Sequence, residues 1–261
     1  MTRCMKGRVA KAACVLALCV GWVGTAEARR NEVPGFRPHE PSIKWSSHLL
    51  DEGEWSVGLA FAGYGLAPDL TLGSYVSDLL LGNLNARGRL GVGSDSEQFH
   101  VALEGGVGFI TPLSLVYLAV DDPQTLPALT VMDVAVPITH ELEGRPTFVT
   151  VKPWVALSIG EVNRDAAATL PLLLRRSALT GPGLNVVVES HTSKYVGVMG
   201  QADVGLDVYG GEVAFGTSVR GAVVFAGGPL RANIGFGLLA GFSERRIELA
   251  PVPAVDIWAR F

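Results

Sequence analysis

The chain has very little cysteine, and all of it lies at one end. Its 261 residues include three cysteines, Cys4, Cys14 and Cys19, which fall within the first 28 residues. Those residues have the form of a secretory signal peptide: a basic start, an apolar core over residues 12–23 and a small-residue cleavage site at Ala26-Glu27-Ala28. Cleavage after Ala28 leaves no cysteine, which excludes disulfides, thiolate catalysis and cysteine-ligated metals in the mature chain.

A long apolar run and an excess of basic charge are also missing. After the leader, the longest uncharged run covers residues 105–120, is broken by Pro112 and is too short for a bilayer-spanning helix. The leader takes four of the 21 basic and one of the 25 acidic residues, so the mature net charge is −7. This acidic net charge does not indicate the basic surface that binding of nucleic acid requires.

Motifs that bind metals or cofactors are scarce as well. The stretch Gly235 to Ala240 matches the letters of a dinucleotide fingerprint, but it lacks the strand before it and the helix after it that give such glycines their role. The histidines show no helical zinc-ligand spacing; they are His39, His48, His100, His140 and His191. We therefore expect no metal and no cofactor.

What the chain does contain is a repeated alternation of apolar side chains with small or polar ones. In residues 98–109, Phe99, Val101 and Leu103 alternate with residues such as Glu104. The pattern recurs in the segments 54–62, 147–160, 203–209, 213–225 and 231–242, and turn signals such as Gly181-Pro182-Gly183 separate the segments. Strands of this kind cross a membrane when they close into a barrel, in which every backbone group is paired.

The segments predict an all-β, closed antiparallel transmembrane β-barrel of about twelve strands. Two weaker strand candidates lie near residues 113–120 and 168–178, and ten strands would result if both are loops. Even numbers are expected for a bacterial single-chain barrel. Glycine makes up 32 of the 261 residues, which is more than usual and suits a tightly curved wall.

The last strand ends in an aromatic residue. Phe261 is preceded at alternate positions by Ala259, Ile257 and Val255. With the signal peptide, this pattern resembles the terminal strand of the bacterial outer-membrane β-barrel superfamily, which the barrel-assembly machinery recognises. The resemblance implies a location in the outer membrane of a Gram-negative-type cell, with lipid and the secretion and assembly machineries as partners. Ala259, where barrels usually have a bulkier residue, and Pro253 depart from the pattern.

The expected organisation has three parts: a signal peptide over residues 1–28, an extended N-terminal segment over 29–43 and the barrel over 44–261. The prolines of the middle segment favour an extended chain, which either hangs as a periplasmic tail, the interpretation we favour, or tucks into the lumen. Aromatic residues near segment ends are expected in belts at the membrane interfaces; they are Trp55, Tyr64, Trp154, Tyr195, Tyr209 and Trp258.

Charged residues opposite the apolar stripes are expected to line the lumen; they are Arg87, Arg89, Glu104, Lys152, Asp203, Asp207, Arg220 and Arg231. Charges of mixed sign either line a narrow pore and set its selectivity or pair across the interior and close it. Small barrels are filled by side chains and large ones hold a channel, and twelve strands lie between the two. The chain is thus expected to be a passive pore or transporter of unspecified small solutes, or else a non-conducting structural or adhesive barrel.

Two minor alternatives remain. His191 and Ser193 would share one face of a strand, and with Glu212 they resemble the His-x-Ser pair and downstream Glu of outer-membrane lipid A deacylases. Lys194, where that family has Asn, and the long spacing to Glu212 depart from the family pattern. The other alternative is a soluble periplasmic β-sandwich, in which a second sheet would cover the apolar face.

Overall fold

The computed structural model describes residues 41–80, 83–92, 98–110, 129–143, 146–159, 180–193, 195–209, 212–227, 229–243 and 246–261. These residues belong to one compact unit. The elements are β1 (Trp55–Gly58), β2 (Ala62–Ala67), β3 (Leu70–Ser74), α2 (Val76–Leu80), β4 (Asn83–Gly91), β5 (Phe99–Ile110), β6 (Leu129–Ala135), β7 (Ile138–Glu141), β8 (Thr147–Ile159), β9 (Gly181–His191), β10 (Val196–Tyr209), β11 (Glu212–Gly227), β12 (Leu230–Ser243) and β13 (Arg246–Arg260). Within these ranges, no helix has the length and apolar character needed to cross a membrane.

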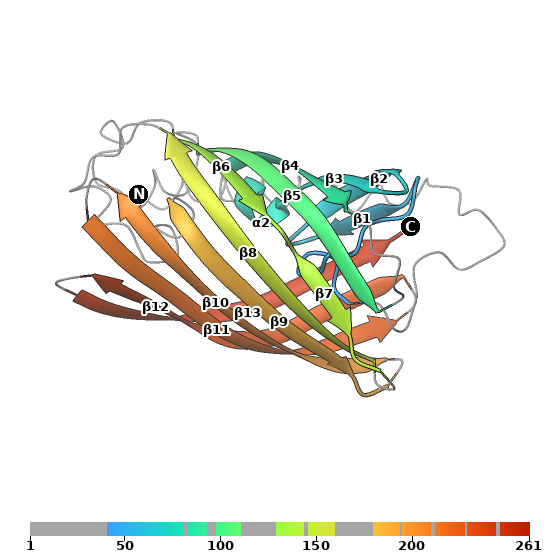
Figure 1. Cartoon of the computed structure of the whole chain (residues 1–261). Coiled ribbons are helices and arrows are strands. Elements are labelled where there is room, and N and C mark those ends of the chain that lie inside the picture. Colours follow the sequence, from blue (N-terminus) through green and yellow to red (C-terminus); the bar gives the residue numbers. More distant parts are fainter. Residues whose placement is uncertain are drawn as a thin grey trace, which may run out of the picture. The chain divides into compact units, whose positions relative to one another are not determined.

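The strands close into one antiparallel barrel (Figure 1). Neighbours along the chain pair with each other, and β1 pairs with β13 to complete the ring, with Val57 opposite Ala259. Both β6 and β7 lie between β5 and β8, so they are two halves of one strand interrupted at Val136 and Pro137. Twelve strand positions result, which confirms the predicted closed barrel of twelve strands.

The segments that form the twelve strands differ from the predicted segments in two places. The segment 54–62 was expected to be one strand, which is wrong: the chain reverses at residues 59–61 and continues as β2. Phe61 consequently points inward, into a cluster with Ile43 and Leu50. The two weaker strand candidates, 113–120 and 168–178, lie outside the described residues, and the strands reach twelve without them.

The two ends of the barrel differ. The start of β1 and the end of β13 share one end with the short connections 68–69, 92–98, 142–146, 192–195 and 228–229. We call this the turn end. The opposite end, which we call the loop end, carries the longest connections, 111–128 and 160–180. Short turns beside the chain ends and longer loops opposite them are the usual arrangement of outer-membrane barrels.

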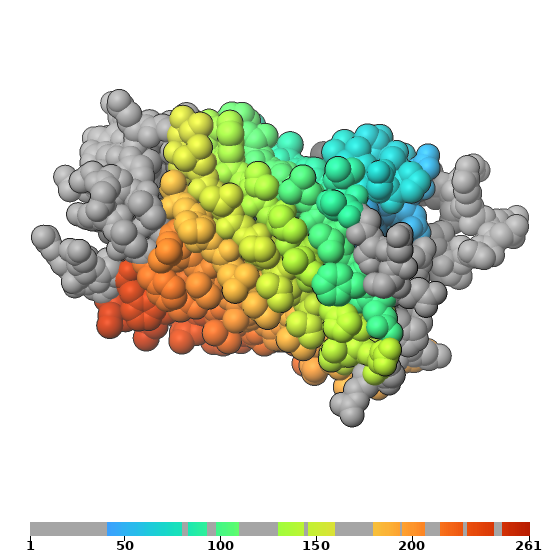
Figure 2. All heavy atoms as spheres, viewed as in Figure 1, coloured from blue at the N-terminus to red at the C-terminus, as the bar shows by residue number. Residues whose placement is uncertain are grey.

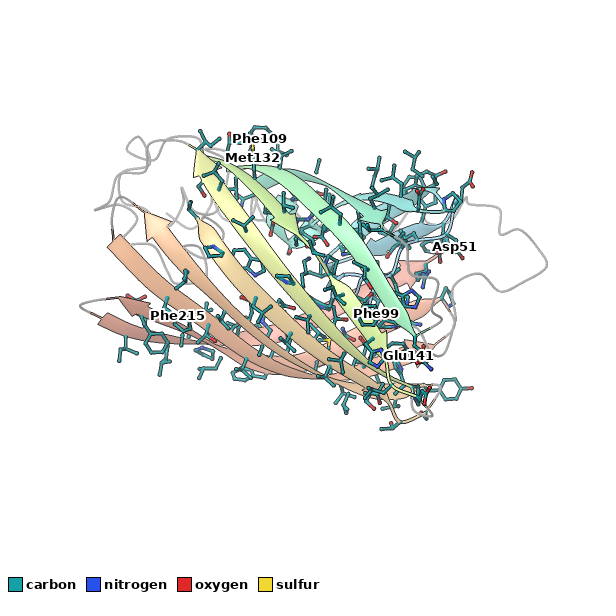
Figure 3. All side chains as sticks on the ribbon, in the orientation of Figure 1. Asp51, Phe99, Phe109, Met132, Glu141 and Phe215 are labelled. Carbon is teal, nitrogen blue, oxygen red and sulfur yellow. The ribbon has the colours of Figure 1, made fainter. Side chains whose placement is uncertain are left out.

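The outer face of the wall is apolar. Phe99, Phe109, Met132 and Phe215 point away from the barrel (Figure 3), and side chains of β5 to β9 form a continuous surface on one face (Figure 2). Phe236 of β12 has 61% of its surface exposed. In a sandwich a second sheet would cover such residues, whereas all the described strands belong to one sheet. The wall therefore suits contact with lipid.

The expected aromatic belts are present only in part. Trp55 and Tyr195 are exposed, and the Trp55 ring packs 4.5 Å from that of Tyr64. Trp258 is only 6% exposed and Trp154 lines an internal cavity, so the belt interpretation is wrong for both. Each lies at an even-numbered position of a strand whose odd-numbered residues face outward. The Tyr209 side chain lies outside the described part.

Within the described residues, one edge of β13 is mostly unpaired. β12 pairs along nearly all of β13, but the four-residue β1 reaches only Trp258 to Arg260. Odd-numbered residues of β13 direct their main-chain groups toward β1, as the hydrogen bond from Phe261 N to the Trp55 carbonyl shows. Pro251 and Pro253 fall on two odd-numbered positions beyond the end of β1. Because proline has no N–H, neither leaves a donor on this edge, which explains why Pro253 is tolerated here.

Close packing between β11 and β12 leaves no room for a side chain at Gly235. A Cβ atom added to Gly235 would overlap the carbonyl oxygen of Gly221 and the Cα of Ala222, whereas one added to Gly221 would meet nothing within 4 Å. We expect Gly235→Ala to destabilise the barrel by about 1–3 kcal/mol and to lower the yield of heat-modifiable folded protein on gels. Gly221→Ala, the matched control, should fold normally, and equal yields would contradict this packing.

Candidate functional site

A segment of the chain before β1 lies inside the barrel. Ser42, Ile43, Ser46, Ser47 and Leu50 are each at most 3% exposed, although they belong to no strand. Their partners come from strands around the whole wall, which places the segment in the lumen. We call residues 41–50 the plug. Of the segment 29–43, for which we favoured a periplasmic tail, residues 29–40 lie outside the described residues and residues 41–43 belong to the plug.

Polar side chains of the wall hold the main chain of the plug. Three main-chain N–H groups of the plug donate to side chains of β9, β7 and β3: Ser42 N to Glu189 Oε2 (2.9 Å), Ser47 N to Thr139 Oγ1 (2.8 Å) and Leu50 N to Thr71 Oγ1 (2.9 Å). In addition, the Ser47 hydroxyl donates to the main-chain carbonyl of His100 on β5 (3.0 Å). These side chains replace the backbone partners that a strand would have had, so the plug can be buried without leaving these donors unpaired.

Arg89 on β4 is the main anchor of the plug. Its Nη1 donates to the carbonyl oxygens of Ile43 at 2.6 Å and His48 at 3.0 Å, and its Nη2 lies 3.4 Å from that of Lys44. The same guanidinium donates to Glu104 Oε2 from Nε at 3.2 Å and from Nη2 at 2.7 Å. The five donors of an arginine allow it to serve both partners at once. Arg89 thereby links the plug to the charged residues of the wall.

Glu104 on β5 is the centre of a charge cluster in the lumen. Its carboxylate oxygens lie 2.9 Å from Lys152 Nζ, Oε1 lies 3.0 Å from Arg87 Nη2, and the Tyr75 hydroxyl donates to Oε1 at 3.0 Å. Arg87 also forms a bidentate ion pair with Asp133 on β6. The cluster therefore ties together the neighbouring strands β4, β5, β6 and β8 on the inner face of the wall. Removing one member of such a cluster leaves a buried charge uncompensated.

The predicted lumen residues fall into two groups. Arg87, Arg89, Glu104 and Lys152 meet in this cluster. The others lie apart from it: Asp203, which accepts a hydrogen bond from Asn185 at 3.0 Å, and Arg220 line a cavity, Arg231 is buried at the turn end of β12, and the Asp207 side chain lies outside the described part. Sequence reasoning missed Asp133, although the alternation around it in residues 129–135 was a usable signal. No periodicity marked the plug.

A chamber lies between the plug and the loop end. It consists of two adjoining cavities of about 480 and 250 Å³, which share Trp45, Tyr75, Asp78 and Asp203 in their linings. Trp45, from the plug, forms the floor, and it packs on a buried cluster that includes Met199 and Val224. The docked plug thus shapes one side of the chamber.

Lys44 of the plug brings a cation to this floor. Its Nζ lies 4.5 Å from the centre of the Trp45 ring and 5.3 Å from that of Tyr75, within the range of cation–π attraction. Burial lowers the pKa of Lys44 to about 8, and the carboxylates of Asp256 and Asp78 oppose that shift. Burial raises the pKa of the Asp78 carboxyl on α2, and the positive charge of Lys44 opposes that shift.

The structure does not bring the predicted hydrolase residues together. His191 faces the lumen, with Nε2 3.0 Å from Glu189 Oε1. Ser193 lies in the turn after β9, where its Oγ accepts hydrogen bonds from two main-chain N–H groups of the same turn. Glu212 begins β11 at the other end of the 14-residue β10, roughly 45 Å away at ~3.3 Å per residue, and its side chain is not described. This correction removes the proposed triad.

No group of three or more metal-ligating side chains occurs among the residues that the structure describes. No family model and no curated protein matches the sequence. A solved structure described as "Outer-membrane expressed OmpT of Vibrio cholerae" is similar, with 13% identity and a TM-score of 0.44 over 77% of this chain and 63% of that one. The chain thus spans less than two thirds of the length of that protein. The closed wall, apolar outside and polar inside, is itself the architecture of an outer-membrane β-barrel.

The anchoring role of Arg89 can be tested by access to a cysteine in the plug. A chain of residues 29–261 has no cysteine of its own, so Ser47→Cys introduces a unique thiol at a buried position. We expect this thiol to resist a water-soluble maleimide, and Arg89→Met to expose it because three carbonyl contacts of the plug are lost.

Arg87→Met is the matched control, because it removes the same charge beside Glu104 but no contact with the plug. It should leave the thiol protected. Equal labelling of the two arginine variants would mean that the charge cluster, and not the contact of Arg89 with the plug, keeps the segment in the lumen.

Proposed function

We propose that the protein is an outer-membrane pore for small solutes that is closed at rest by its own plug and conducts when residues 41–50 leave the lumen. The observation that carries this proposal is that the wall holds the plug largely through hydrogen bonds to its main chain. Such bonds can be exchanged for bonds to water at a net cost of about 0.5–1.5 kcal/mol each. Displacement is then compatible with an intact barrel.

The wall behind the plug supports the same proposal. Many of its most buried side chains are polar, beside apolar ones such as Phe148 and Val224; Thr71, Thr139, Thr150, Glu189, Ser218 and Asn233 are each at most 2% exposed. A barrel that is permanently solid can fill its interior with apolar side chains. A polar wall instead provides a surface that water can cover once the plug has left. The chamber beyond the plug would then continue the path toward the loop end.

A non-conducting structural barrel is the second candidate, and the Glu104 cluster favours it. The ion pairs among β4, β5, β6 and β8 join wall residues to one another. Arg89 is the member of the cluster that also contacts the plug. They would stay in the lumen after the plug had left and could keep it closed. Under either function, lipid and the secretion and barrel-assembly machineries are the expected partners, and Phe261, Ile257 and Val255 the expected assembly signal.

Locking the plug separates the two candidates. Ser47 N lies 2.8 Å from Thr139 Oγ1, so these two neighbouring positions are the pair that we choose for a disulfide between plug and wall. We expect the reduced Ser47→Cys, Thr139→Cys protein to show channel openings in a planar bilayer and the oxidised protein to lose them.

The control lock is Thr147→Cys with Ser190→Cys, a cross-strand pair whose hydroxyl oxygens lie 2.7 Å apart without touching the plug. Its oxidation should not change the openings. Deletion of residues 29–50 should give a constantly open barrel. A folded deletion variant that passes no current would reject the pore and favour the structural barrel.

The docked plug should also respond to pH through Lys44. Docking lowers the pKa of Lys44 from 10.5 to about 8, so between these values the displaced state binds more protons than the docked one. Rising pH over this window therefore favours docking, and the dependence ends below pH 8, where both states are protonated. We expect the open probability to fall from pH 8 to 10 in bilayer recordings. Lys44→Met should flatten that slope, and an unchanged slope would assign it to another group.

A further inference from the structure

The larger cavity of the chamber reaches both faces of the wall. Trp45 and Asn233 line it from inside the barrel. Leu59, Pro253 and Val255 line it as well, although these odd-numbered residues of β13 and of the end of β1 face outward, with Leu59 37% and Val255 51% exposed. A cavity behind a complete wall would not touch side chains of the outer face. The cavity therefore passes over an edge of the wall at this point.

The edge results from the short strands at the start of the barrel. The chain reverses between β1 and β2 at residues 59–61, and β3 ends at the same level, where Ala62 pairs with Ser74. Beyond this level β13 continues to Arg246 and β4 to Asn83, and none of the described strands lies between them. We call this interruption of the wall the side opening.

The side opening is wide enough for an alkyl chain. Three strands are missing between β4 and β13 at this level, so four strand spacings correspond to roughly 19 Å of wall. The helix α2 follows β3 into this region, and a helix is about 10 Å across. Ser77 and Asp78 of α2 line the larger cavity opposite Pro253 and Val255 of β13. The free width therefore lies between α2 and β13.

The side opening lies at the level of the lipid-facing band. Along the unpaired part of β13, Pro253 pairs on its other side with Phe236 of β12, and Pro251 pairs with Leu238. Phe236 is 61% exposed on the outer face, and the apolar stripe of β13 continues toward the loop end as far as Ile247, which is 71% exposed. The apolar outer band of a barrel marks the hydrocarbon layer. The side opening therefore faces hydrocarbon and not the solution beyond the loop end.

The edge of β13 beside the side opening is suited to lipid. Its odd-numbered residues direct their main-chain groups into the opening, and two of them, Pro251 and Pro253, have no N–H. An unpaired N–H group is tolerated less often than an unpaired carbonyl, so loss of the donors is the more useful change. Proline also prevents a further strand from pairing regularly along an edge. This edge therefore favours contact with acyl chains over addition of a strand.

We propose that the larger cavity is open sideways to the bilayer between α2 and β13, and that an acyl chain of a neighbouring lipid enters it there. The chain passes Leu59 and Pro253 and reaches the ring of Trp45 on the floor of the chamber. An apolar solute dissolved in the membrane has the same route into the lumen. Because the plug remains docked, this inference goes beyond the gated pore, and either can fail without the other.

Quenching of Trp45 fluorescence by lipid tests the proposal. In the chain of residues 29–261, Trp55→Phe, Trp154→Phe and Trp258→Phe leave Trp45 as the single tryptophan. The protein is reconstituted in phosphatidylcholine vesicles with brominated acyl chains, and in unbrominated vesicles for reference. We expect Trp45 to lose fluorescence in the brominated lipid, because bromine quenches an indole only at close range. Absence of quenching would overturn the proposal.

A chain with Trp154 as its single tryptophan is the matched control. Trp154 also lines the chamber from inside, but it lies on β8, where β6 and β9 pair on either side of it and the wall is complete. Its fluorescence should be nearly the same in the two lipids. Quenching of Trp154 as strong as that of Trp45 would mean that bromine acts through the wall, and would also overturn the proposal. Oxidised Ser47→Cys, Thr139→Cys protein should give the same result for Trp45, since the locked plug cannot carry that ring out to the lipid.

Narrowing the side opening should reduce the quenching of Trp45. Ala254 lies at an inward-facing position of β13 and lines the larger cavity, so Ala254→Leu fills space beside the opening. Ala250→Leu makes the same change at an inward-facing position of β13 nearer the loop end, away from the cavity lining, and should leave the quenching unchanged. Heat-modifiability on gels verifies that each variant is folded. Undiminished quenching in Ala254→Leu would show that lipid reaches Trp45 by another route, which would overturn the assignment to the side opening.

Discussion

Every main-chain donor and acceptor in a lipid-facing wall needs a partner, and the rest of this structure depends on that constraint. The constraint is met by closure of the sheet, with β1 joined to β13 at a seam that also holds a bidentate ion pair between Glu54 and Arg260. Inside the barrel, the plug meets the same requirement by other means, since wall side chains take the place of a partner strand. Along the edge of β13 that no described strand pairs, two prolines remove the donor.

The inside of the barrel is organised around the shared carboxylate of Glu104. Arg89 uses it to hold the plug, while Arg87 and Lys152 use it to join the neighbouring strands β4, β5 and β8 on one side of the wall. Near the turn end the charged groups of the lumen are thereby paired with one another, whereas in the chamber some buried amide oxygens have no partner among the described residues. The charge cluster and the chamber thus differ in how fully the described residues satisfy their polar groups.

Alternation predicted the wall well because a strand has a period of two, so sequence position translates directly into inward or outward direction. The directions of Glu104 and Lys152 follow from it without any tertiary information. The rule failed where the chain leaves the strand: the reversal at residues 59–61 contains no glycine or proline to mark it, and β9 ends at His191, so the pairing of His191 with Ser193 never applied. The plug follows no period, because its contacts are set by the wall around it.

The short strands β1, β2 and β3 determine where the plug and the chamber lie along the barrel. Strands of four to six residues cannot match the fifteen of β13, so the wall beside β13 is complete only near the turn end. The plug lies at that level, where the wall can surround it and supply partners from all sides. Beyond it the same short strands leave Pro253 of β13 at the margin of the cavity. A full-length β1 would pair that edge through main-chain hydrogen bonds, and the two prolines, which cannot donate, would then weaken the wall.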